Sequence, residues 1–102
     1  MKLEHEDLEK LKKQLLAIIG RHIDLASYGV FFFGSRVNGR SVEQSDIDIG
    51  IEGDKPLPPG LLSDIQDEIE ALPVLYKIDA VDFAKVNESF KAVAKQQVES
   101  VL

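Results

Sequence analysis

The apolar positions of this chain follow two patterns, one typical of helices and one typical of strands. Apolar residues at helical spacing predict helices from about Glu4 to Ile19, from Leu61 to Leu72, and from about Glu88 to the end. Runs rich in strand formers predict strands at residues 28–33, 46–51 and 74–83. With a short helix or loop after the first strand, this order predicts one α/β domain over residues 1–102.

The second predicted strand, Asp46-Ile47-Asp48-Ile49-Gly50-Ile51, alternates strictly. Both aspartates share one face with Gly50, and the three isoleucines share the other, which can bury against helices. Two carboxylates on one face repel each other, and a cation held by oxygen ligands, such as Mg²⁺, relieves this repulsion. An Asp-x-Asp pair alone is a weak signal, and Asp46 capping a turn with Asp48 in solvent on an edge strand is its simpler interpretation; the Gly-Ser pair upstream reverses this preference.

A Gly-Ser pair ends the first predicted strand. Gly34 can adopt backbone angles that other residues avoid. Ser35 stands where a helix would begin, and the free N–H groups there suit a phosphate. Arg36 and Arg40 are four residues apart and would share a helix face, where they could neutralise a triphosphate. A solvated basic face is the alternative for both arginines.

The combination Gly34-Ser35, ten residues, Asp46-x-Asp48 resembles the signature of the DNA polymerase β-like nucleotidyltransferase superfamily. The form Gly34-Ser35-Arg36-x-x-Gly39-Arg40 resembles, more narrowly, the minimal nucleotidyltransferases (MNT proteins) that are often paired with a HEPN-type helical partner. The resemblance covers nearly the whole chain. It implies an α/β (α+β) palm-like core, a small mixed twisted sheet with helices on one side, in which the first two strands pair and the third lies beside one of them.

A third carboxylate is expected on the third strand, where alternation places Asp79 and Asp82 on opposite faces. The pattern alone does not decide between them. The resemblance points to Asp79, within Ile78-Asp79-Ala80-Val81, and leaves Asp82 at a strand end or turn. Lys77 shares the face of Asp79, and a surface lysine is its simpler interpretation. Assistance by Asp82 or Lys77 stays open.

The resemblance implies metal-dependent transfer of an NMP unit, AMP from ATP, to an acceptor hydroxyl with release of pyrophosphate. It assigns two Mg²⁺ ions to Asp46, Asp48 and Asp79. It assigns the triphosphate to Gly34, Ser35, Arg36 and Arg40. The implied acceptor is a HEPN-type partner, with this chain as the antitoxin of a toxin–antitoxin pair. The alternative is a non-catalytic binding antitoxin or a nucleotide-binding subunit of a two-component complex.

The composition of the chain restricts the kinds of partner and the location that we expect. The net charge of −6 disfavours long nucleic acid, whose phosphates need basic patches. No apolar run reaches the roughly 18 residues of a bilayer span, and the charged N-terminus lacks a signal core. The absence of cysteine excludes thiolate chemistry and fits the cytoplasm. We expect no acceptor-binding domain within these 102 residues and therefore expect a helical partner; a homo-oligomer stays open.

Two apolar groups have competing interpretations. Phe31, Phe32 and Phe33 alternate faces in a strand, which favours core packing over a base-stacking surface. Near the C-terminus, Val98 and Val101 with Leu102 could cover a partner or pack on the domain's own sheet, and the sequence does not separate these two alternatives.

Overall fold

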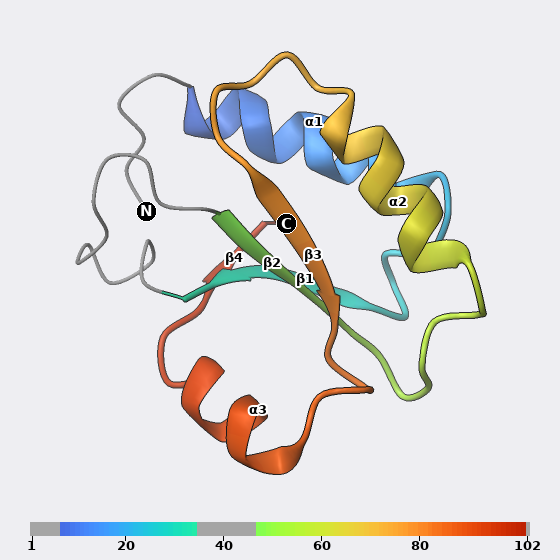
Figure 1. The fold of residues 1–102 in the computed structure, drawn as a ribbon, viewed down its shortest axis with the longest axis vertical. Helices are drawn as coiled ribbons and strands as arrows, with labels where there is room; N and C mark the ends of the chain where they lie inside the picture. Colours follow the sequence, from blue (N-terminus) through green and yellow to red (C-terminus); the bar gives the residue numbers. More distant parts are fainter. Residues whose placement is uncertain (1–6, 35–46, 102) are drawn as a thin grey trace.

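The computed structural model describes residues 7–34 and 47–101. Their helices are α1 (Leu8–Gly20), α2 (Leu61–Glu70) and α3 (Glu88–Ala94). Their strands are β1 (Gly29–Phe33), β2 (Ile47–Glu52), β3 (Ile78–Asp82) and β4 (Glu99–Ser100). The expected order of helices and strands is confirmed for these residues, with β4 as an addition (Figure 1). None of the described helices is long and apolar enough to cross a membrane.

The strands form one mixed sheet in the order β3-β2-β1-β4. β1 lies antiparallel to β2 and to β4, whereas β2 and β3 run parallel. A parallel pair needs a crossover connection, and the segment that contains α2 provides it. The expected mixed sheet, with the first two strands paired and the third beside one of them, is therefore confirmed.

One face of the sheet buries against α1 and α2. Ile47, Ile49 and Ile51 of β2 are fully buried there, together with the apolar stripe of α1. The stripe is Leu11, Leu15, Ile18 and Ile19. α1 begins at Leu8 because the Asp7 carboxylate accepts hydrogen bonds from the free backbone N–H groups of Glu9 and Lys10, at 3.0 and 3.3 Å.

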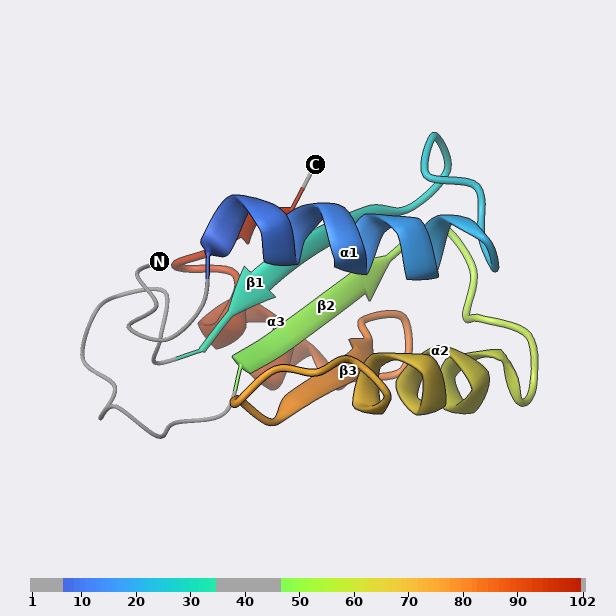
Figure 2. The same cartoon turned by 90° about the horizontal axis from the view of Figure 1, so that it is seen from above.

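The opposite face is covered by α3, so the expectation of helices on one side only is wrong (Figures 1 and 2). Phe31, Phe33 and Phe83 form a second buried cluster on this face, and Ala94 of α3 packs against it. The physical reason is that Phe31 and Phe33 alternate with Phe32, so β1 carries large apolar side chains on both faces and needs cover on both.

The expected helix to the end of the chain is also wrong. α3 ends at Ala94, and the chain returns as β4 beside β1. Val101 is only 2% exposed, and its backbone N–H donates to the carbonyl of Val30 at 3.0 Å. Val98 is 45% exposed. Their spacing fits a helix face but does not require one, and packing of Val101 in the core outweighs that local pattern. Leu102 lies outside the described residues.

Two other expected boundaries shift inward. α2 ends at Glu70, before Pro73, and β3 begins at Ile78 instead of residue 74. In both cases the apolar residues at the end of the predicted element lie in the connection between α2 and β3. Tyr76, in this connection, is still buried in the main core.

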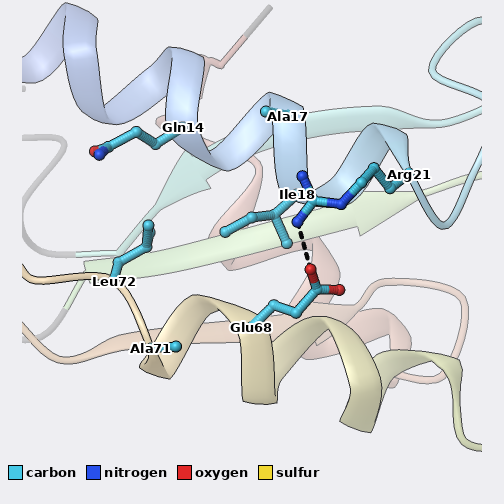
Figure 3. A pocket seen from close by; sticks show the side chains of 7 residues that line it. All are labelled: Gln14, Ala17, Ile18, Arg21, Glu68, Ala71 and Leu72. Atoms are coloured by element: carbon cyan, nitrogen blue, oxygen red, sulfur yellow. Dashed lines mark hydrogen bonds and ion pairs between the residues drawn. The ribbon is translucent and has the colours of Figure 1, made fainter.

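A polar contact joins α1 to α2. Arg21 and His22, just after α1, both contact the carboxylate of Glu68 on α2. Figure 3 shows the Arg21–Glu68 pair at one end of an open groove between the two helices. Hydrogen bonds from Arg21, and then from His22, hold the pKa of Glu68 below its usual value of 4.5.

Loss of this contact should show in the pH dependence of stability. A carboxylate whose pKa is lowered by folding stabilises the fold above its unfolded pKa, and this contribution disappears as pH falls through the folded pKa. Glu68→Gln should therefore melt below wild type at pH 7, and the gap should close in acid below the ordinary pKa of 4.5. Thermal melts across this range measure it. Asp67→Asn, an exposed carboxylate on the same helix, is the control. A gap independent of pH would contradict the prediction.

Val98 and Val101 should contribute differently to the free energy of unfolding, because only Val101 is buried. Val101→Ala should lower the free energy of unfolding by about 1.5–3 kcal/mol, because it removes buried methyl groups and leaves a cavity. Val98→Ala should change it by less than about 0.5 kcal/mol. Denaturant unfolding of both variants tests this, and equal losses would show that the burial of Val101 does not matter to stability.

Candidate active site

A row of three side chains crosses the α3 face of the sheet at one end. Asp48 of β2 is in register with Phe33 of β1 on one side and with Asp79 of β3 on the other. Residues in register on neighbouring strands point to the same face, with strands about 4.7–4.9 Å apart. Both carboxylates are half-buried. Because Asp48 and Asp79 are in register on neighbouring strands, their carboxylates are close enough to bind one ligand or cation together.

This register confirms that Asp79, and not Asp82, lies on the face of Asp48. The side chain of Asp82 is 4% exposed on the opposite face. It accepts hydrogen bonds from the backbone N–H of Leu57 at 2.9 Å and of Ala84 at 3.0 Å. Asp82 thus fastens the loop after β2 to the turn after β3, which is the turn role expected of it.

Gly34 touches the row directly. Its φ is +89°, and a Cβ at this position would lie 2.7 Å from an Oδ atom of Asp48. Any other residue would be strained in its backbone and would displace the carboxylate. The glycine of the Gly-Ser pair therefore both turns the chain and leaves room for the Asp48 side chain.

Gln66 of α2 supports the strand that carries Asp79. Its amide nitrogen donates to the carbonyl of Ile78 at 2.8 Å, and its amide oxygen accepts from the N–H of Ala80 at 2.9 Å. These two groups flank Asp79 along the backbone. Gln66 was not predicted from the sequence, because a polar residue on an amphipathic helix gives no signal of such a contact.

Several predicted site residues fall outside the described part of the chain. These are Ser35, Arg36, Arg40 and Asp46. Lys77 is described and exposed, and its carbonyl accepts from the N–H of Ile47 at 2.9 Å. Within residues 7–34 and 47–101, no three histidine or acidic side chains gather as a metal site. The described residues therefore supply a pair of carboxylates, and a triad would need Asp46.

An aromatic layer lies beside the row. A Cβ on Gly50 would come within 2.5 Å of the Phe31 ring and 2.8 Å of the Phe83 ring, so the glycine makes room for both. The Phe83 ring meets Phe31 and Phe33 edge to face, with centroids 4.8 and 5.0 Å apart. Gly50 was placed correctly on the carboxylate face, but its packing role was not foreseen.

Comparison with known proteins gives a family match over most of the chain. The family described as "Polymerase beta, Nucleotidyltransferase" matches residues 26–101, from the turn before β1 through β4. The chain is 26% identical over 88 residues to the probable protein adenylyltransferase MntA of Haemophilus influenzae, covering 84% of this chain and 77% of that protein.

Solved structures share the fold. A chain of a toxin–antitoxin crystal structure with AMP-PNP superposes with a TM-score of 0.71 at 18% identity, over 89% of this chain and 72% of that one. A chain of the tri-AMPylated Shewanella oneidensis HEPN toxin in complex with MNT antitoxin gives a TM-score of 0.67 at 17% identity, over 92% and 71%.

Substitution of Gly34 should move the Asp48 carboxylate. Gly34→Ala and Gly60→Ala should each lose about 1–2 kcal/mol of stability, because both glycines have positive φ, +89° and +83°. Gly60 has no neighbour within 4 Å of a new Cβ, so it is a matched control for backbone strain alone. Only Gly34→Ala should shift the carboxylate ¹³C resonance of Asp48 in NMR spectra. An unmoved resonance in Gly34→Ala would show that the two groups do not touch.

Proposed function

Since the chain belongs to the polymerase beta nucleotidyltransferase family, we propose that it transfers AMP from ATP to a hydroxyl group of a HEPN-type partner protein. In this proposal the chain is the antitoxin and the partner is the toxin. The observation that carries the proposal is the register of Asp48 with Asp79, next to the close approach of Gly34. The similarity to an adenylyltransferase supports AMP as the transferred unit.

In the proposed reaction, the acceptor oxygen forms a bond to the α-phosphorus of ATP. The bond from that phosphorus to the oxygen bridging the β-phosphate breaks, and pyrophosphate leaves with the electron pair. Asp79 takes the proton of the acceptor hydroxyl. Asp48, held between Phe33 and Asp79 on the sheet, keeps its carboxylate aimed at the same space. Fixed positions of this kind supply much of the rate in phosphoryl chemistry.

The donor atoms of the row fit Mg²⁺. Two half-buried carboxylates on one face offer hard oxygen ligands, and their mutual repulsion favours a cation between them. Asp48 and Asp79 would hold the metal together with Asp46. Bound there, Mg²⁺ would offset the negative charge that develops on the attacking and leaving oxygens.

The triphosphate would lie along the turn after β1. We assign it to the backbone N–H groups around Ser35 and to the side chains of Arg36 and Arg40, which would offset its charge. Gly34 supports this assignment, because it turns the chain beside the Asp48 carboxylate with a φ of +89°, directly before Ser35.

The acceptor is proposed to be a protein. The MNT antitoxin of Shewanella oneidensis occurs in complex with a tri-AMPylated HEPN toxin. The net charge of −6 of this chain disfavours a nucleic acid acceptor. We propose the cytoplasm, where ATP is available, as the location.

Transfer of label from α-³²P ATP to the product of the gene adjacent to that of this chain, in the presence of Mg²⁺, tests the proposal. Asp79→Asn should lower transfer by about three orders of magnitude or more, because it removes a charge from the reacting centre. Asp82→Asn is the matched control. It should cost about 1–3 kcal/mol of stability by disturbing two backbone hydrogen bonds, yet keep near-normal transfer at temperatures where it is folded.

Two results would contradict the proposal. Loss of transfer in Asp82→Asn, with Asp79→Asn active, would mean that the wrong carboxylate has been assigned. Binding of the partner by the wild-type chain with no label transfer would favour a non-catalytic antitoxin.

A further inference from the structure

Phe90 is an unusual residue on α3. It is an aromatic side chain that is 44% exposed, although its ring contacts the buried aromatic layer. Its ring centroid lies 6.0 Å from that of Phe33, at an interplanar angle of 84°, and 6.1 Å from that of Phe83. Phe90 is therefore fixed from one side while much of its surface faces outward.

Phe90 is connected to the Asp48–Asp79 pair through Phe33. Phe33, its edge-to-face partner, is in register with Asp48 on the same face of the sheet. Asp79 follows in the same row. Phe33 thus contacts Phe90 and is in register with the first residue of the carboxylate pair.

One polar contact caps α3 at its start, and two others join it to the sheet. The Asn87 side chain accepts from the N–H of Phe90 at 2.7 Å and caps the helix. Lys91 and Lys95 both approach the Glu52 carboxylate of β2, at 3.7 and 2.7 Å. These contacts fix the helix without covering Phe90. Val93, 68% exposed and one turn further on, extends the apolar surface.

We propose that Phe90, with Val93 beside it, is the platform on which the base of the bound nucleotide stacks. This inference rests on the proposed function, in which the α-phosphate of the nucleotide reacts at Asp48 and Asp79. A nucleotide held there by its phosphates extends its base to one side by the length of a ribose. An exposed aromatic ring, held from behind by other rings, offers the flat apolar surface on which bases stack.

The chemistry of the patch favours a base over another ligand group. The phosphates bear the negative charge of a nucleotide and would be repelled by an acidic edge unless a cation intervenes. The base is uncharged and gains from burial of apolar area. The patch next to the carboxylates is apolar and aromatic, so it complements the one part of the nucleotide that needs neither metal nor arginine.

Binding of Mg²⁺ with a non-hydrolysable ATP analogue, measured by calorimetry, tests the platform. Phe90→Leu, which keeps an apolar side chain against Phe33 but lacks a ring, should weaken binding by roughly 5- to 150-fold, the range for loss of base stacking. Phe90→Trp should restore it. Binding of Mg²⁺ with inorganic triphosphate, which has no base, should be equal in Phe90→Leu and wild type. Leu75→Ala, at a residue that is 76% exposed, is the matched control and should change neither affinity.

The outcomes separate this inference from the proposed function. If wild type transfers AMP but Phe90→Leu binds the ATP analogue with unchanged affinity, the platform is wrong and the function stands. If Phe90→Leu loses triphosphate and ATP analogue alike, Phe90 serves the fold and the platform is wrong. If it loses only the HEPN-type partner, the patch is a protein interface and the inference fails. If wild type binds no nucleotide, both proposals fail.

Discussion

The burial of one face of β2 fixes the direction of the Asp48 carboxylate, next to which the other candidate catalytic groups of the described residues lie. Ile47, Ile49 and Ile51 are fully enclosed by α1 and α2, so the intervening residues must face the other way. A slip of one residue would bring the Asp48 carboxylate into the core and expose the isoleucines, at a large cost in free energy. The same packing that stabilises the domain therefore orients its acids.

The sequence was enough to predict this central feature because strand alternation depends on local geometry alone. It was not enough to choose between Asp79 and Asp82, since each could have faced Asp48 if β3 had been shifted by one residue. The resemblance to the nucleotidyltransferases pointed to Asp79, and the register of β2 with β3 agrees. The register between two strands that are distant in the sequence cannot be predicted from a short window of residues.

The features that were missed depend on contacts between distant segments. β4 has only two residues and too little pattern to be recognised, yet its neighbour Val101 completes the core. α3 lies on the second face because Phe31, Phe33 and Phe83 need cover there, a requirement that becomes visible only once the strands are paired. Of the predicted phosphate and metal groups, only Gly34, Asp48 and Asp79 lie among the described residues, so the assignments of Ser35, Arg36, Arg40 and Asp46 stay predictions.

The borders of the sheet have a consequence for behaviour in a crowded solution. The outer side of β3 is engaged at Ile78 and Ala80 by the amide of Gln66, which takes the place of a further strand. The opposite border, β4, offers only two residues for pairing. Unpaired strand edges allow sheets of separate molecules to join, and natural proteins block this by shortening or covering them. Both edges of this small sheet are protected in one of these ways, which should limit self-association through the backbone and keep the molecule available for a partner recognised by its side chains.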